Sequence, residues 1–166
     1  MSFASVTGTI RRKIFTHANG MVDVSAKRVS NRSAVASCSI EAPQRIVDAI
    51  FSPAGTVNNK GNVIQTARIA GIMGSKKTSD LMPLCHQIPL SHVSLEISRL
   101  SPTKIGLTSR VKTHNQTGVE MEALTAVSIA ALTVYDMSKS ALKGTSDRIV
   151  ITDISLDSKT ITDSIS

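Results

Sequence analysis

The sequence predicts an α+β domain built on an antiparallel β-sheet, and three observations lead to this prediction. Segments in which apolar and polar residues alternate lie between stretches with the apolar spacing of helices. The 166 residues contain no internal repeat, low-complexity tract or interdomain linker, which fits one domain. Hydrophobic residues make up 41% of the chain and charged residues 19%, as in folded globular proteins rather than disordered chains.

The first half of the domain predicts one strand and two helices. In residues 34–40 every even-numbered residue is apolar, which predicts a strand. A short helix follows from Pro43 to Phe51, because proline favours the first turn and Ser52-Pro53 stops the helix. A second helix is predicted over residues 62–74 from one stripe of small and apolar side chains. This stripe consists of Val63, Ala67, Ala70 and Gly74.

The second half predicts a hairpin, a long helix and a last strand. Residues 93–97 and 105–111 alternate as strands and are separated by Ser101-Pro102, so they predict an antiparallel hairpin. A long helix is predicted over residues 118–143 and a final strand over residues 148–156. The resulting order is βααββαβ. Without one of the first two helices this is the ferredoxin-like pattern, with helices packed on one face of an antiparallel sheet.

The ends of the chain differ in composition from its middle. Residues 1–22 contain Arg11, Arg12 and Lys13 but no acidic residue, which predicts a basic, flexible N-terminal segment. An organellar presequence is the alternative. We expect one domain over residues 23–159 and a C-terminal tail over residues 160–166. The predicted location is the cytoplasm, or the mitochondrial matrix if the basic segment is a presequence.

Charge and cysteine content restrict the function classes. Nineteen Lys and Arg against twelve Asp and Glu give a formal charge of +7, which favours an anionic partner such as nucleic acid, acidic lipid or nucleotide phosphates. Cys38 and Cys85 lie far apart without metal-ligand spacing, so we expect two reduced thiols and no metal or cofactor. Aromatic residues reach only 2%, so extra burial in an oligomer interface is plausible.

The predicted long helix carries two candidate groups of charged residues. Asp136 and Lys139 are three residues apart and therefore neighbours, either as a surface ion pair or as an acid–base couple. Thr117 and Glu120 fit a capping box, which would explain Glu120 structurally. Glu122 lies roughly 200° around the helix from Glu120, so the two carboxylates should not share a face. It is either a solvated first-turn acid or a contact to a ligand or second subunit.

The remaining candidates lie in loops. His86 lies between Pro83 and Pro89, in a segment that we expect to be extended or looped. Lys60 precedes the second predicted helix and Lys76 follows it, so roughly 20 Å separate them. One small ligand could contact both only if the helix lies along the site or if two chains contribute. His17, His92 and His114 have no partners at useful spacing and are interpreted as surface groups.

Several motifs in combination resemble one enzyme family. They are residues 21–27, Lys60-Gly61, residues 66–72, residues 78–86 with Leu84-Cys85-His86, and residues 118–139. Together they resemble the cyclic pyranopterin monophosphate synthases (MoaC-type) of molybdenum cofactor biosynthesis, over residues 21–159. The chain departs from the family at Ser138, where a cysteine is usual, and after Lys159, where a glycine-rich Gly-Gly-Lys-Ser-Gly segment is missing.

The resemblance implies a reaction and an assembly. Members of this family are lyases that convert cyclised dihydroguanosine triphosphate to cyclic pyranopterin monophosphate and release pyrophosphate. They are ferredoxin-like proteins that form homohexamers, trimers of dimers, with sites between subunits. We therefore expect a nucleotide-derived triphosphate as substrate, and neither nucleic acid nor membrane as partner.

The resemblance also implies the site residues. Asp136, Lys139 and Lys60 match the catalytic aspartate and lysines. The substrate-binding set would be Leu84, Cys85, His86, Met121, Glu122, Glu120, Lys76 and Arg32. The cations among these suit a triphosphate, and a lysine whose pKa is lowered by neighbouring cations could move protons near neutral pH.

Two other functions remain open from the sequence. The chain could be a non-catalytic homologue that serves as an assembly partner. It could also be a small nucleic-acid-binding module, because its charge is basic and its pattern ferredoxin-like. Such sheets usually stack bases on aromatic side chains, and residues 92–100 and 104–112 contain no Phe, Tyr or Trp.

Overall fold

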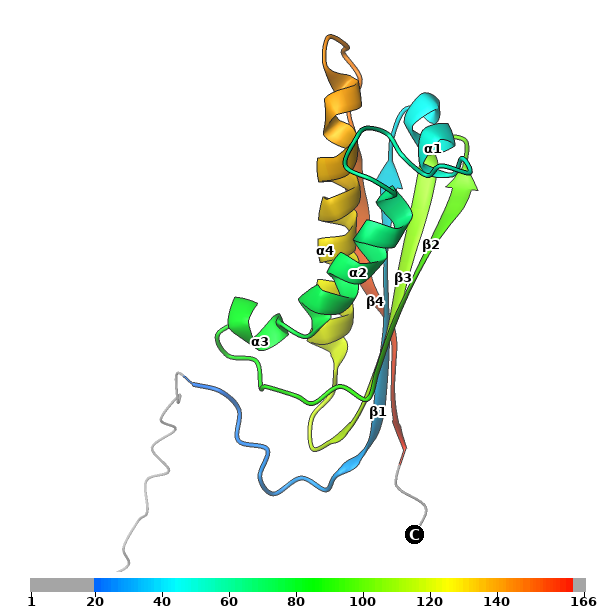
Figure 1. Ribbon diagram of the computed structural model, residues 1–166. Coiled ribbons are helices and arrows are strands. Elements are labelled where there is room, and N and C mark those ends of the chain that lie inside the picture. Colours follow the sequence, from blue (N-terminus) through cyan, green and yellow to red (C-terminus); the bar gives the residue numbers. More distant parts are fainter. Residues whose placement is uncertain (1–19, 163–166) are drawn as a thin grey trace, which may run out of the picture.

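The computed structural model describes residues 20–162, which form one four-stranded antiparallel sheet covered by helices on one face (Figure 1). The strands are β1 (Ser30–Glu41), β2 (His92–Ser101), β3 (Lys104–Asn115) and β4 (Val150–Thr162). The helices are α1 (Gln44–Ile50), α2 (Val63–Ser75), α3 (Thr78–Leu81), α4 (Glu120–Ser138) and the 3₁₀-helix η1 (Lys139–Leu142). The predicted α+β class with a ferredoxin-like sheet is confirmed.

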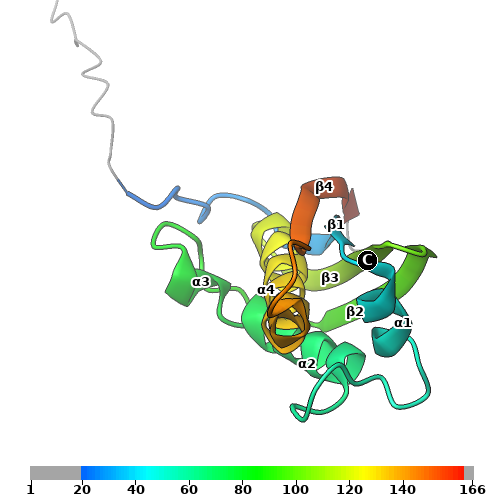
Figure 2. The same ribbon diagram turned by 90° about the horizontal axis from the view of Figure 1, so that it is seen from above.

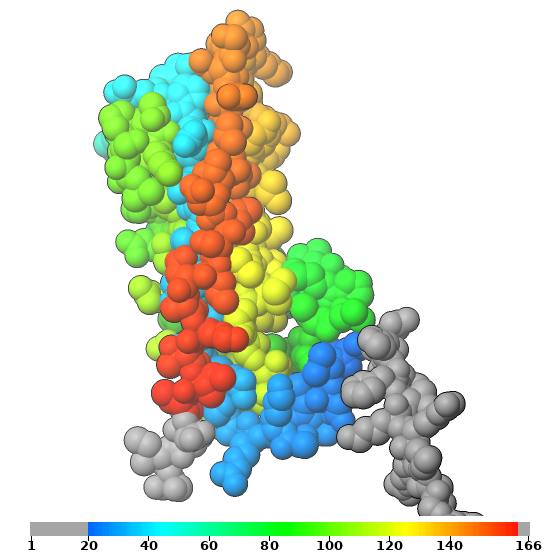
Figure 3. All heavy atoms as spheres, turned by 180° about the vertical axis from the view of Figure 1, so that it is seen from behind, coloured from blue at the N-terminus to red at the C-terminus, as the bar shows by residue number. Residues whose placement is uncertain are grey.

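Strand order determines what lies at the centre of the sheet. The order is β2-β3-β1-β4, with every neighbouring pair antiparallel. Seen from above, α2 and α4 lie side by side over the sheet (Figure 2). From the opposite side, β4 runs down the length of the molecule beside α4 (Figure 3). The central strands β1 and β3 therefore supply most of the sheet face that the helices bury.

The core is made of small and β-branched side chains. The even-numbered residues of β1 from Ala34 to Ile40 are all buried, as the alternation predicts. Helix α4 buries Ala123, Ala126, Ala130 and Ala131, whose short side chains let α2 approach closely. At Gly71 a β-carbon would stand 2.7 Å from the backbone oxygen of Ala126. Few large aromatic residues are present in this chain, and small residues fill the contact between α2 and α4.

The boundaries and inner faces of some elements differ from the prediction. The buried stripe of α2 is Val63, Ala67, Gly71 and Ser75, so Gly71 and Ser75 replace Ala70 and Gly74. The α-helical part of α4 ends at Ser138, and the predicted last turn is 3₁₀, a common way for a helix to end. The sequence reasoning missed α3, because four residues are too few to show a helical period.

The last strand is longer than predicted. Strand β4 runs from Val150 to Thr162 because its final residues pair with β1, where Thr162 is opposite Asn31. The segment predicted as a tail is therefore strand as far as Thr162, and residues 163–166 lie outside the described residues. Most of the predicted basic segment, residues 1–19, also lies outside them. Within residues 20–162 no helix is long and apolar enough to cross a membrane.

Candidate active site

One carboxylate and two lysines meet where α4 ends. Lys139 Nζ lies 2.6 Å from Asp136 Oδ1, and Lys60 Nζ lies 2.6 Å from Asp136 Oδ2. The loop before α2 carries Lys60 there, because the Asn58 side chain donates to the Met137 carbonyl and accepts from the Lys60 backbone N–H. We call Lys60, Asp136 and Lys139 the aspartate–lysine cluster. The predicted catalytic residues thus lie together in one chain.

The cluster fixes the charges of its members at neutral pH. Hydrogen bonds from Lys139 and then Lys60 lower the pKa of Asp136 to about 2. The Asp136 carboxylate in turn raises the pKa of Lys139 above its ordinary value. The suggestion that neighbouring cations lower the pKa of a catalytic lysine does not apply to Lys139 in the single chain, because its partner at 2.6 Å is the Asp136 carboxylate. Lys139 is an ammonium donor here, not a neutral base.

Six predicted substrate-binding residues line a hollow at the opposite end of α4. Its volume is about 410 Å³. The six residues are Leu84, Cys85, His86, Glu120, Met121 and Glu122. The loop after α3 supplies the first three and the first turn of α4 supplies the others. We call this space the histidine hollow.

Glu122 is a buried carboxyl, not the solvated acid that was one interpretation of the sequence. Its exposed fraction is 4%. Burial raises the pKa of Glu122, and the Glu120 carboxylate raises it further. The pKa of Cys85 is raised by burial and by Glu122. Although Glu120 and Glu122 lie roughly 200° apart around the helix, as the sequence predicts, both line the histidine hollow.

The predicted capping box does not form. The N-cap of α4 is Val119, and no side chain caps this end. The Glu120 carboxyl instead folds over Gly118, where any β-carbon would collide with it. Its Oε1 lies 3.2 Å from Lys159 Nζ on β4. Glu120 is therefore free of a capping role and joins the rim of the hollow, which a sequence match to a capping box could not exclude.

The N-terminal segment supplies a wall of the hollow that sequence reasoning did not assign to the site. Val22, Val24 and Lys27 line it, and His86 Nε2 lies 2.8 Å from the Val22 backbone oxygen. The available signal was the matched motif at residues 21–27, which precedes the first strand and has no role in the core. Lys27 adds a cation beside the two carboxylates.

Arg32 and Lys76 lie outside both groups. Arg32 lines a hollow of about 340 Å³ next to Ser91 and donates from Nε to the Asn115 carbonyl at 3.0 Å. Lys76 lines a space of about 300 Å³ that also includes Ser91 and His92. Ser91 lines both spaces. In one chain they do not join the aspartate–lysine cluster.

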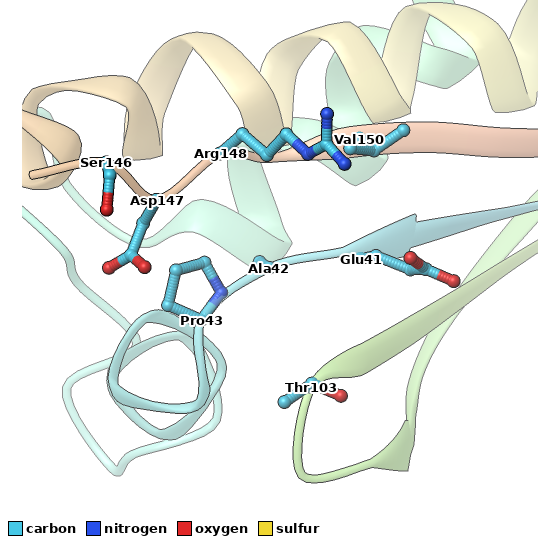
Figure 4. A pocket seen from close by; sticks show the side chains of 8 residues that line it. All are labelled: Glu41, Ala42, Pro43, Thr103, Ser146, Asp147, Arg148 and Val150. Atoms are coloured by element: carbon cyan, nitrogen blue, oxygen red, sulfur yellow. The ribbon is translucent and has the colours of Figure 1, made fainter.

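Another hollow, about 590 Å³, lies between the turn after β1 and the loop before β4 (Figure 4). Arg148 extends along β4 and Glu41 projects from the end of β1. Asp147 is held by Arg45 at 2.6 Å. No predicted site residue lines this hollow. Among the described residues, no group of three or more His, Cys, Asp or Glu side chains is placed to hold a metal ion.

The two main groups are too far apart for one small ligand in a single chain. Fourteen residues of α4 separate Glu122 from Asp136, which at 1.5 Å per residue is roughly 21 Å along the helix axis. Lys60 and Lys76 likewise lie beyond opposite ends of α2. The chain therefore presents two partial sites, one at each end of its helix pair.

Curated relatives are similar to this chain over most of its length. A Jannaschia sp. (strain CCS1) protein named cyclic pyranopterin monophosphate synthase is 50% identical over 134 residues, 77% of this chain and 80% of the relative. A protein of the same name from Streptomyces coelicolor is 49% identical over 140 residues, 84% of this chain and 78% of the relative. The Arabidopsis thaliana "Cyclic pyranopterin monophosphate synthase, mitochondrial" is 46% identical over 142 residues, 84% of this chain and 50% of the relative.

A family model agrees with these relatives and with the motifs of the sequence. The model described as the MoaC family matches residues 21–161. This range contains the aspartate–lysine cluster, the histidine hollow and all of the sheet except Thr162, the last residue of β4. The resemblance seen in the sequence is thereby confirmed, and this chain belongs to the MoaC family.

Proposed function

We propose that this chain is a cyclic pyranopterin monophosphate synthase, a lyase that converts cyclised dihydroguanosine triphosphate to cyclic pyranopterin monophosphate and releases pyrophosphate. The observation that carries the proposal is the aspartate–lysine cluster, in which two ammonium groups flank one carboxylate at 2.6 Å. Relatives that bear this name are 44–50% identical to the chain. We assign the catalytic residues and the fold to one domain, residues 23–159.

The cluster suits proton transfer on an anionic substrate. Lys139 and Lys60 carry two positive charges against one negative charge on Asp136, so the cluster attracts phosphate. Lys139 is protonated and hydrogen-bonded, which suits a general acid. Asp136, whose pKa is lowered, stays ionised and orients both amines. Release of pyrophosphate and closure of a cyclic phosphate both need such positioned cations.

The histidine hollow suits the base-derived part of the substrate. Glu120 and Glu122 offer carboxyl oxygens to N–H donors of a guanine-derived ring. The predicted cations Lys76 and Arg32, which lie outside this hollow, suit the phosphates. We assign Leu84, Cys85 and Met121 to packing around the ring, because they line the same hollow.

A second copy of the chain would complete the site. The outer sides of α2 and α4 expose four large apolar side chains, Ile69, Met73, Leu132 and Tyr135. Tyr135 is adjacent to Asp136, so covering this surface would bring another chain against the aspartate–lysine cluster. We propose a homohexamer, a trimer of dimers, in which one chain's cluster faces another chain's histidine hollow. This arrangement would let two groups roughly 21 Å apart in one chain act on one substrate.

The test is turnover of cyclised dihydroguanosine triphosphate, followed as pyrophosphate release and pyranopterin formation. Lys139→Ala and Lys60→Ala should each lower kcat by at least about 10²-fold, since positioned acid–base groups contribute this much or more. Lys104→Ala is the matched control, because it removes a half-buried lysine that, among residues 20–162, forms an ion pair with Asp153 away from the cluster. Normal turnover by either cluster variant would contradict its catalytic role. No turnover by the folded wild type would leave the non-catalytic assembly partner as the function.

The cell compartment is tested separately. The Arabidopsis relative carries "mitochondrial" in its name, whereas the composition of residues 1–22 led us to predict a basic tail on a cytoplasmic protein. The mass of the protein isolated from its own cells decides between a retained basic tail and a cleaved mitochondrial presequence. A full-length chain in the cytosol supports the tail, and removal of the basic segment in a mitochondrial fraction supports the presequence.

A further inference from the structure

The segment before β1 lies against the candidate site without being buried there. We call residues 22–27 the strap. Figures 1 and 3 show this N-terminal stretch, in blue, running below the N-terminal end of α4 and beside the segment around α3. Its apolar residues do not hold it, because Val22 is 68% exposed. The strap is therefore placed by something other than the hydrophobic effect.

Polar contacts hold the strap in place. Asp23 Oδ1 accepts a hydrogen bond from the Ser25 backbone N–H at 2.9 Å, and the Lys27 N–H donates to the Val24 carbonyl at 2.9 Å. These bonds fold the strap into a tight turn. The Gln116 side chain, just before α4, donates to the Ser25 carbonyl at 3.2 Å. The turn is thus tied to the same region that supplies Glu120 and Glu122 to the hollow.

The contact between the strap and His86 defines the protonation of the imidazole ring. His86 Nε2 lies 2.8 Å from the Val22 carbonyl oxygen. A carbonyl oxygen accepts hydrogen bonds and cannot donate them, so Nε2 must carry the hydrogen. In the neutral ring the other nitrogen, Nδ1, then holds the only free lone pair. No other hydrogen bond of His86 is found among residues 20–162.

We propose that the Val22 carbonyl is a positioning group that holds His86 in its Nε2-protonated tautomer and leaves Nδ1 to take a proton from the substrate. This inference rests on the proposed function, because it places the proton transfer in that reaction. Nδ1 accepts the proton of a substrate O–H or N–H, and that bond's electron pair stays on the substrate atom. The ring becomes an imidazolium, whose Nε2–H bond to Val22 strengthens as the ring gains charge.

The same hollow is lined by charged and titratable groups that act on the proton transfer to His86 in opposite directions. The carboxyls of Glu120 and Glu122 stabilise an imidazolium when ionised, and Lys27 opposes it. Cys85 is the remaining titratable group of the hollow, and burial raises the pKa of its thiol, so the thiol stays neutral. The strap thus contributes both the carbonyl that orients His86 and a cation, Lys27, that lines the same hollow.

The tautomer can be observed directly in the full-length protein. With ¹⁵N-histidine labelling, two-bond proton–nitrogen spectra distinguish a ring protonated at Nε2 from one protonated at Nδ1, and His86→Gln identifies the signals of His86. The expected result at a pH where the ring is neutral is protonation at Nε2. Protonation at Nδ1, or rapid exchange between the two forms, would overturn the proposal. This readout does not need activity, so it separates failure of this inference from failure of the proposed function.

Turnover of the proposed substrate tests the consequence. His86→Gln keeps an N–H donor for Val22 but lacks the basic ring nitrogen, so kcat should fall by about 10²-fold or more with the fold intact. Asp23→Ala loosens the strap without touching the hollow, and should lower kcat and mix the tautomers of His86 together. His114→Gln is the control, because His114 is exposed, lies outside the hollow, and its ring hydrogen-bonds Asn31. Unchanged kcat and tautomer in Asp23→Ala would contradict a positioning role.

Discussion

Asp136 is the residue whose surroundings most directly affect how stability depends on pH. Its folded pKa of about 2 lies below the reference value of 3.8, because Lys139 and Lys60 hydrogen-bond the carboxylate. A depressed carboxyl pKa contributes stability that is fully present above the reference pKa and is lost as pH falls through the folded pKa. The contribution should therefore disappear between about pH 4 and pH 2.

The comparison of wild type with Asp136→Asn measures this effect. We expect the difference in unfolding free energy between the two proteins to be constant from neutral pH to about pH 4 and to shrink below it. Urea unfolding at several pH values gives this difference. A difference that stays constant down to pH 2 would show that the ion pairs do not persist in solution.

Ser138 offers a test of packing beside the cluster. Its side chain is fully buried, and its hydroxyl has no hydrogen-bond partner among the described residues. Because an unpaired buried polar group costs about 1–3 kcal/mol, Ser138→Ala should raise the free energy of unfolding by an amount in this range. Denaturant titration measures it.

Ser109→Ala is the matched control for that prediction. Ser109 is equally buried, but its hydroxyl donates to the Ala123 carbonyl at 2.8 Å. Its loss should therefore destabilise the protein by roughly 1 kcal/mol. If both alanine variants are destabilised alike, the Ser138 hydroxyl has a partner in solution.

At the residue scale, the sequence predicted which side chains form the site better than it predicted their burial and their neighbours. The aspartate–lysine spacing predicted the ion pair of Asp136 and Lys139 correctly, since residues three apart on a helix are neighbours. The second contact of Asp136, with Lys60 Nζ at 2.6 Å, could not be predicted from helix spacing, because it depends on the loop that carries Lys60. The burial of Glu122 was also beyond the sequence, since it depends on how α4 packs against segments that are distant in the chain.

At the scale of elements, the contact of α2 with α4 depends on the absence of a side chain at Gly71. A methyl group there would stand 2.7 Å from the Ala126 backbone oxygen, which cannot move without shifting α4. Gly71→Ala should therefore lower the free energy of unfolding by about 1–3 kcal/mol, as overpacking does, despite alanine's better helix propensity. Thermal unfolding followed by circular dichroism measures the loss.

Gly74→Ala controls for helix propensity at the same interface. Its added methyl group would meet only the Ile129 side chain, which can adopt another rotamer. We expect a smaller loss of stability than for Gly71→Ala. A stabilised Gly71→Ala variant would mean that the two helices are farther apart than described here.

Helices and strands were predictable where apolar residues recur with the spacing of a helix or a strand. Alternation located β1, β2 and β3 because one face of each strand is buried, and Asn62 correctly marked the start of α2. The full length of β4 was not predictable, because its last residues owe their conformation to pairing with β1 and not to their own pattern. The strap has no period at all, so only its motif could single it out.

At the scale of the whole molecule, the chain carries two partial sites at opposite ends of one helix pair. The aspartate–lysine cluster supplies acid–base groups, whereas the histidine hollow supplies His86 and the buried carboxyl of Glu122. An apolar surface on α2 and α4 borders the cluster. In the proposed oligomer, a second copy on this surface would let one chain's cluster and another chain's hollow act on one substrate.

Complementation between two inactive variants directly tests whether each site is shared between two chains. His86→Ala and Lys139→Ala chains are purified separately, shown to be inactive, and then unfolded and refolded together. If each site combines one chain's cluster with another chain's hollow, mixed oligomers contain some sites with both groups intact, and turnover of cyclised dihydroguanosine triphosphate should return. Mixed oligomers, verified by native mass spectrometry, that remain as inactive as either variant alone would contradict a site shared between chains.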